Sequence, residues 1–207
     1  MRVTVALTGA SGMPYGVRLL EALVHAQCRI AVVYSQAAQI VARQECDLVL
    51  AAQPREAARQ LGARFNASEG QIEVYGQQDW MAPIASGTNA ADAMAICPCT
   101  VGTLGAIANG LADNLIERAA DVMLKERRRL VLVPRETPLS TIHLENMLKL
   151  SQAGAVILPP APGFYALPRT VDDLVDFVVA RVLDQLGVRH TLGPRWGDDH
   201  TPPTLSV

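Results

Sequence analysis

The sequence predicts an α/β fold in which a doubly wound parallel sheet lies between two layers of helices, a three-layer αβα arrangement. Short β-branched runs alternate along the chain with longer segments of helical periodicity. The short runs are apolar without alternation, which is typical of strands that are buried on both faces. Right-handed crossovers would then place the intervening helices on both faces of one parallel sheet.

The βα units can be followed from the first residues onward. A strand over residues 3–7 precedes a helix over 15–26 whose apolar side chains share one face. Further strands are expected at 30–34, 93–96, 130–133 and 155–158. Further helices are expected from 37, from 104, and over 114–127, 139–152 and 171–186. Between these units the segment 47–89 is less regular, with a helix at 54–61 and a weaker strand at 71–75. The pattern does not establish the order of the strands.

The length of 207 residues fits a single domain, which we place at residues 1–190. Residues 191–207 contain several prolines and are expected to form a C-terminal tail. Two alternatives are open for this tail. It docks on a neighbouring subunit through Trp196, or it makes no fixed contact.

Composition narrows the class of protein. Half of the residues are hydrophobic and only 18% are charged, which favours an oligomer over a small monomer. The net charge is −2 and no basic run is longer than the three arginines at 127–129, so nucleic acid is not expected as a partner. The first apolar run is too short for a signal peptide, and no apolar stretch approaches the roughly 20 residues that span a bilayer. We therefore expect a cytoplasmic protein that does not bind membranes.

The cysteines do not suggest a metal site. Cys28, Cys46, Cys97 and Cys99 form no framework of spaced pairs. The single C-x-C pair lacks the second pair and the histidines of a structural zinc site. We interpret the four residues as reduced thiols that pack in the interior, and we predict no metal.

The loop after the first strand carries the clearest functional pattern. It reads Thr8-Gly9-Ala10-Ser11-Gly12-Met13-Pro14-Tyr15-Gly16, and its small residues permit a tight turn. Backbone N–H groups at the start of the next helix would then be free to face an anion. The loop has neither the spacing of a triphosphatase P-loop nor that of a dinucleotide site.

The second strand ends at Tyr34 and Ser35, without the acidic residue that reads the ribose of NAD. A mononucleotide such as FMN fits this loop better. Ser35 either binds the ribityl chain or caps the next helix.

Three later loops also follow predicted strands, where ligands bind in an open parallel sheet. The loop 97–103 offers two hydroxyls and a glycine before a helix. Arg135 and Glu136 place opposite charges at one strand end, and the proline-rich segment 159–165 could hold an aromatic ring over a pocket.

Several of these motifs, taken in order, closely resemble the UbiX/Pad family of flavin prenyltransferases. The similarity extends from about residue 2 to residue 187. The motifs that carry it are Thr8-Gly9-Ala10-Ser11-Gly12, Arg118-Ala119-Ala120-Asp121-Val122 with Leu124-Lys125-Glu126, Pro134-Arg135-Glu136-Thr137-Pro138-Leu139, and Pro160-x-Pro162-x-Phe164-Tyr165.

The resemblance implies a flavodoxin-like, Rossmann-like fold and a homododecamer with its sites at subunit interfaces. It also implies an enzyme that joins a dimethylallyl group from dimethylallyl phosphate to N5 and C6 of reduced FMN, without a metal. The product, prenylated FMN, serves UbiD-type decarboxylases of ubiquinone synthesis and aromatic acid metabolism.

The resemblance also assigns site residues. Those implied for FMN are Gly9, Ala10, Ser11, Ser35, Thr100, Val101, Gly102, Thr103, Arg118 and Arg135. Those implied for the prenyl donor are Ser86, Gly87, Lys125, Arg135, Glu136, Tyr165 and Arg181. One position departs from the family pattern, because Thr100 stands where members have serine, and this change keeps the hydroxyl.

The implied reaction explains these residue types. Breaking the C–O bond of an allylic phosphate leaves a phosphate dianion and a carbocation, so cations and a proton donor are needed beside the phosphate, where the resemblance also places Glu136. Trp80 and the reduced flavin offer π faces to the carbocation. Glu45, assisted by Ser11, is the candidate base for the ring proton that is lost.

Two alternatives remain. The flavin-dependent cysteine decarboxylases share the fold but carry a Pro-Ala-Ser-Ala-Asn-Thr stretch, and this chain has no asparagine at the matching positions 98–103. A non-catalytic FMN-binding module would need the flavin loops but not Lys125, Glu136, Tyr165 and Arg181. We therefore prefer the prenyltransferase.

Overall fold

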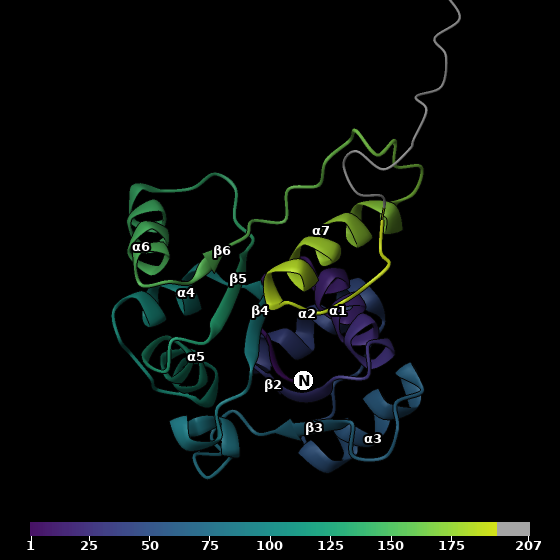
Figure 1. Cartoon of the computed structure of the whole chain (residues 1–207), viewed down its shortest axis with the longest axis horizontal. Helices are drawn as coiled ribbons and strands as arrows, with labels where there is room; N and C mark the ends of the chain where they lie inside the picture. Colours follow the sequence, from purple (N-terminus) through teal and green to yellow (C-terminus); the bar gives the residue numbers. More distant parts are fainter. Residues whose placement is uncertain (194–207) are drawn as a thin grey trace, which may run out of the picture.

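The computed structural model describes residues 1–193 and consists of one parallel sheet with helices on both faces (Figure 1). The strand order in the sheet is β3-β2-β1-β4-β5-β6, and every neighbouring pair is parallel. The strands are β1 (Arg2–Leu7), β2 (Arg29–Tyr34), β3 (Ile72–Tyr75), β4 (Ala93–Cys99), β5 (Arg129–Pro134) and β6 (Val156–Ile157). The predicted fold class is confirmed.

The helices divide between the two faces of the sheet. One hydrophobic cluster packs α1 (Met13–His25), α2 (Gln36–Cys46), α3 (Pro54–Phe65) and α7 (Val171–Leu186) against it. A second cluster packs α4 (Val101–Ala108), α5 (Leu115–Lys125) and α6 (Thr141–Gln152) against the opposite face. Two short 3-10 helices, η1 (Pro83–Ala85) and η2 (Gly87–Asn89), precede β4. The two sets of helices lie on opposite sides of the strands in Figure 1.

Local sequence explains where several helices begin. The Ser35 hydroxyl accepts the N–H of Ala38, and the Thr100 hydroxyl accepts the N–H of Thr103. Thr170 forms a reciprocal capping box at the start of α7. A hydroxyl at the N-cap satisfies an N–H group that has no partner inside the helix, which fixes the first residue of the helix.

Most predicted elements are present with shifted ends. The helix expected at 139–152 begins at Thr141, and the strand expected at 155–158 is only the pair Val156–Ile157. The strand order, which the sequence left open, reverses between β1 and β4. This reversal matters because ligands of doubly wound sheets bind at that point, beyond the carboxyl ends of the strands.

An ion-pair network holds α7 against α1. The Arg18 guanidinium contacts Asp176 of α7 through Nε at 2.6 Å and Nη2 at 3.1 Å, and contacts Glu21 through Nη1 at 2.8 Å. These bonds raise the pKa of Arg18. The late helix α7 therefore has a fixed position against the first βα unit.

Within residues 1–193, no helix is long and apolar enough to cross a membrane. The same residues contain no group of three or more histidine, cysteine, aspartate or glutamate side chains that could hold a metal ion. The predicted contact through Trp196 lies outside the described residues.

Candidate functional site

The loops that follow β1 and β4 meet where the strand order reverses, and Thr8 joins them. Its buried hydroxyl donates to the Pro98 carbonyl at 2.8 Å and accepts the N–H of Thr100 at 2.8 Å. The predicted flavin loops 8–12 and 100–103 are therefore held side by side. Sequence reasoning did not assign a role to Thr8, although a threonine at the buried end of a strand was a visible signal.

Glycine is required in the first loop for two separate reasons. A Cβ at Gly9 would lie 2.4 Å from the Cβ of Ala37, so this loop packs directly against the start of α2. Gly12 has φ of 106°, in the region that favours glycine. The loop can therefore approach α2 closely and still turn into α1, as its sequence predicted.

The N-terminus of α1 is occupied by a carboxylate of the chain itself. Glu45 Oε2 accepts the N–H of Gly12 at 2.9 Å and the N–H of Met13 at 2.8 Å. The prediction that the N–H groups at this helix start are free for a ligand anion is therefore wrong for these two groups. It failed because Glu45 lies 33 residues further along the chain, on α2, and no local pattern reveals that contact.

The same geometry brings together Glu45 and Ser11, as predicted. Partial burial raises the pKa of Glu45, but hydrogen bonds from the Ser11 side chain and from the backbone of Met13 and Gly12, with the charge of Arg135, outweigh it. The net effect lowers the pKa of this carboxyl. Glu45 is therefore a carboxylate at neutral pH and is able to accept a proton.

This lowered pKa predicts a pH-dependent contribution of Glu45 to stability. A carboxyl with a lower pKa in the folded state stabilises the fold above its unfolded pKa, and the contribution is lost as the pH falls through the folded pKa. We expect wild type to exceed Glu45→Gln in urea stability near neutral pH, with the difference shrinking below the ordinary value of 4.5. A difference that stays constant down to acid pH would contradict the assignment.

The starts of α2 and α4 remain available for an anion. Ser35 and Thr100 each cap one N–H group of the first turn. Among residues 1–193, the N–H groups of Val101 and Gly102 form no hydrogen bond, and a Cβ at Gly102 would come no closer than 4.0 Å to another atom. Two helix N-termini with hydroxyl caps and open space suit a phosphate with a polyhydroxyl chain. The residues present therefore fit FMN.

Arg135 and Glu136 follow β5 at the same edge. Arg135 Nε donates to the Ser11 carbonyl at 3.2 Å, which places this guanidinium beside the first loop. Glu136 is half-buried and its Oε1 accepts the N–H of Thr137 at 3.1 Å. Arg135 thus joins the flavin loops within one chain. We refer to residues 9–11, Ser35, Glu45, 100–103 and Arg135 as the flavin cluster.

A second group of predicted residues lies at the other end of the strands, beside their amino ends. Lys125 ends α5, just before β5 begins, and pairs with Glu126. A Cβ at Gly87 would overlap these two side chains, so Ser86 and Gly87 lie beside them. Arg135 follows the far end of β5, whose six residues span about 20 Å. Lys125 is therefore well separated from the flavin cluster of its own chain.

We refer to Ser86, Gly87, Lys125 and Glu126 as the lysine cluster. Glu126 was missed at the sequence level, because adjacent charges are common on surfaces. Its hydrogen bond to Lys125 lowers the pKa of Glu126. Arg118 lies on the same helix, where its Nε donates to the Ala85 carbonyl at 3.0 Å and its Nη1 pairs with Asp121 at 2.7 Å. Its partners are not residues of the flavin cluster.

A third group of predicted residues surrounds a pocket of about 780 Å³ between α7 and the segment after β6. Tyr165 and Arg181 both line it, as do Phe177, Asp184 and His190. The Tyr165 ring packs edge-on against Phe177, with centroids 5.7 Å apart. Tyr165 and Arg181 therefore share one pocket, and no residue of the flavin cluster lines it.

Trp80 lies on the loop after β3 and is 45% exposed. Its neighbour Met81 is almost fully exposed, at 92%. The structure of one chain does not bring Trp80 into the flavin cluster.

The cysteines fit the prediction of packed thiols. Cys28, Cys97 and Cys99 are buried, Cys46 is partly buried, and all four are free. Burial raises the pKa of Cys97, and raises that of Cys99 to about 12. These thiols are therefore protonated at neutral pH and are poor nucleophiles.

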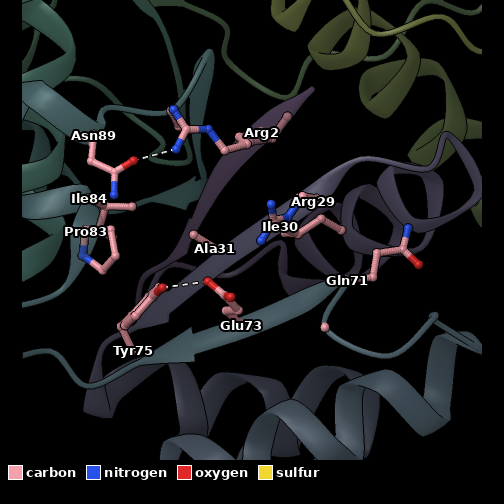
Figure 2. A pocket seen from close by; sticks show the side chains of 13 residues that line it. Arg2, Arg29, Ile30, Ala31, Gln71, Glu73, Tyr75, Pro83, Ile84 and Asn89 are labelled. Carbon is pink, nitrogen blue, oxygen red and sulfur yellow. Dashed lines mark hydrogen bonds between the residues drawn. The ribbon is translucent and has the colours of Figure 1, made fainter.

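A further hollow of about 220 Å³ lies at the amino-terminal part of β1, β2 and β3. Figure 2 shows that its polar side chains largely bond to one another, with Arg2 Nη1 on Asn89 at 2.6 Å and the Tyr75 hydroxyl on Glu73 at 2.7 Å. None of the predicted site residues lines this hollow. It is distinct from the candidate site.

Comparison with known proteins places the chain in a family. The Flavoprotein family model matches residues 1–183. A flavin prenyltransferase UbiX from Pseudomonas aeruginosa is 59% identical over 199 residues, which cover 96% of this chain and 95% of that protein.

Similar solved structures support the same family. AnUbiX (PadA1) in complex with FMN and dimethylallyl pyrophosphate has a TM-score of 0.84 and 42% identity, covering 95% of this chain and 97% of that one. A dodecameric FMN-dependent UbiX-like decarboxylase from Escherichia coli O157:H7 has a TM-score of 0.84 and 45% identity, covering 96% and 100% of the two chains. The chain therefore belongs to the UbiX family of flavin prenyltransferases.

Proposed function

We propose that this protein transfers a dimethylallyl group from dimethylallyl phosphate to N5 and C6 of reduced FMN and releases prenylated FMN. The observation that carries the proposal is the convergence of the flavin loops with Glu45 and Arg135 at the reversal between β1 and β4. Glu45 also caps α1, but a deprotonated glutamate held beside the flavin loops and Arg135 favours a catalytic role over flavin binding alone.

FMN supplies the electron-rich ring that is alkylated, and the chain supplies its binding groups. The hydroxyls of Ser35 and Thr100, which cap α2 and α4, and the N–H groups of Val101 and Gly102 would hold the phosphate and the ribityl chain. Arg135 lies over the first loop, where it can neutralise phosphate charge. Glu45 accepts the proton that the ring loses, and Ser11 relays it.

The prenyl donor is held by cations from the two other groups. Lys125 of the lysine cluster and Arg181 beside Tyr165 bind the phosphate, which leaves with two negative charges. Glu136 acts near the same phosphate, and Trp80 offers its π face to the carbocation.

We propose that the complete site forms between subunits of a homododecamer. The flavin cluster and the lysine cluster do not meet within one chain, because Lys125 and Arg135 lie at opposite ends of β5. No residue of either cluster lines the pocket of Tyr165 and Arg181. Apolar side chains that face solvent on α6, namely Ile142, Leu144 and Leu148, are consistent with burial between copies. The product serves a UbiD-type decarboxylase, and we place the protein in the cytoplasm.

The decisive experiment is an anaerobic incubation of the protein with reduced FMN and dimethylallyl phosphate, followed by mass spectrometry of the flavin. We expect a flavin heavier by one C5H8 unit. An unchanged flavin mass, under conditions in which FMN is bound and reduced, would exclude the transferase. A parallel incubation with a cysteine-ended peptide tests the decarboxylase alternative, and we expect no loss of CO2 from it.

Glu45→Gln is expected to keep FMN binding and to lose most of the prenyl transfer, by a factor of about 100 or more, which is typical for loss of a general base. Glutamine retains an oxygen that can accept the N–H groups of Gly12 and Met13, so the loop should keep its shape. Flavin absorbance of the purified variant and the rate of product formation measure the two effects. Full turnover by the variant would remove Glu45 from the mechanism.

A further inference from the structure

The surroundings of Arg181 contain two residues to which nothing in the preceding sections assigns a role. Arg181 lies on α7 with its side chain about half exposed, and its Nη1 donates to Asp184 Oδ2 at 2.6 Å. Among residues 1–193, the guanidinium forms no other hydrogen bond. Four of its five N–H groups therefore remain for a ligand in the pocket that Arg181 lines with Tyr165.

The second oxygen of Asp184 meets a histidine. His190 Nε2 lies 3.1 Å from Asp184 Oδ1, and the His190 side chain is only 8% exposed. The N–H of Leu192 donates to His190 Nδ1 at 3.2 Å. A nitrogen that accepts a hydrogen bond carries no proton, so the proton of the ring is on Nε2 and is donated to Asp184.

The chain turns back at the end of α7 to make this contact. Gly187 closes the helix with φ of 76°, and the N–H of Val188 returns to the Leu183 carbonyl at 3.0 Å. His190 then lies beside the last turns of the helix that carries Arg181. The sequence from 181 to 192 thus builds a hydrogen-bonded chain from a backbone N–H through His190 and Asp184 to the Arg181 guanidinium.

We propose that Asp184 and His190 are positioning residues that hold Arg181 in place for the phosphate of the prenyl donor. This inference rests on the proposed function of Arg181. A free arginine side chain loses conformational entropy when it binds an anion. A guanidinium that a carboxylate already holds has lost much of that entropy before the anion binds. His190 in turn restrains the carboxylate, because it holds the oxygen of Asp184 that Arg181 does not contact.

Asp184 could instead weaken phosphate binding through charge repulsion, and this alternative makes the proposal testable. Asp184 carries a negative charge close to the place where the phosphate should bind, so its removal could strengthen binding by reducing repulsion. Positioning and repulsion predict opposite signs for the change in KM when the carboxylate becomes an amide. Asp184→Asn keeps the size of the side chain and therefore separates the two effects.

The experiment measures initial rates of prenyl transfer against dimethylallyl phosphate concentration at saturating reduced FMN. For His190→Leu we expect KM for the donor to rise about tenfold, the size expected for one lost hydrogen bond to a charged group, with kcat within about twofold. His190→Gln should restore most of the affinity, because its amide N–H can reach Asp184. Asp184→Asn should also raise KM.

Two matched controls accompany these variants. His25→Leu removes an exposed histidine at the end of α1, and Asp172→Asn removes an exposed carboxylate in the first turn of α7. Both should leave KM unchanged. An unchanged KM in His190→Leu, or a lower KM in Asp184→Asn, would overturn the proposal.

A structural measurement separates this inference from the proposed function. If the wild-type protein makes no heavier flavin, the proposed function fails. Crystal structures of wild type and His190→Leu would still test whether His190 holds Arg181 in one conformation. We expect one conformer of Arg181 on Asp184 in wild type, and a displaced or multiple conformer in the variant. The same single conformer in both structures would refute the role of His190.

Discussion

Two inactive variants, Lys125→Ala and Glu45→Gln, should regain activity when they are co-expressed and assembled into one oligomer. Lys125 lies at the amino-terminal edge of the sheet and Glu45 lies at the carboxyl-terminal edge, so the proposed site takes them from different subunits. Random mixing gives about a quarter of the sites both intact residues, and about a quarter of the wild-type rate is expected.

The matched control mixes two variants of the flavin cluster. Glu45 and Arg135 both contact the first loop of the same chain, through Gly12 and Ser11 respectively. No site in a mixture of Glu45→Gln and Arg135→Ala can therefore contain both intact residues, and no activity should return. Each mixture is isolated with two affinity tags, and flavin product is measured by mass spectrometry. Recovery in the control, or none in the first mixture, would contradict the shared site.

Alanine at position 16 is expected to destabilise the fold strongly. Gly16 lies in the first turns of α1, and a Cβ there would meet the Cys97 carbonyl oxygen at 2.4 Å and Leu7 Cδ2 at 2.8 Å. The carbonyl belongs to the buried strand β4 and cannot move without disturbing the sheet. We expect the free energy of unfolding to fall by about 3 kcal/mol, although alanine is the better helix former.

Gly62→Ala is the matched control, since Gly62 also lies inside a helix, α3, and nothing lies within 4 Å of its missing Cβ. We expect this variant to be more stable by about 0.5 to 1 kcal/mol, because alanine loses less backbone entropy. Urea unfolding at one protein concentration measures both variants, since assembly contributes to apparent stability. Equal effects of the two substitutions would show that helix propensity, not close packing, governs position 16.

The fold was largely predictable because its signals are local. Buried strands such as β4 are apolar on both faces, and each strand is followed or preceded by a helix along the chain. The strand order was not predictable, since parallel neighbours such as β1 and β4 are far apart in sequence and no local pattern encodes their pairing. β6 was expected over residues 155–158 but is only the pair Val156–Ile157, although the N–H of Leu158 still donates to the Leu132 carbonyl of β5 at 2.8 Å.

The candidate site was predictable to the extent that it follows strand ends. Ser35, Thr100 and Arg135 each come directly after a strand, and topology brings those ends to one edge. Glu45 could be suspected only through the resemblance, because it reaches the site from the last turn of α2. His190 and Asp184 were missed, since six residues separate them and only the turn at Gly187 brings them together.

The anchoring of Glu45 by main-chain groups has a consequence for how this protein tolerates change over evolutionary time. The N–H groups of Gly12 and Met13 belong to the backbone, so a substitution at either position keeps them unless it introduces proline. A side-chain partner could be lost by a single substitution, whereas this partner is lost only if the turn itself changes. The orientation of the proposed base therefore depends on the backbone of the first βα unit and not on the identity of one partner side chain.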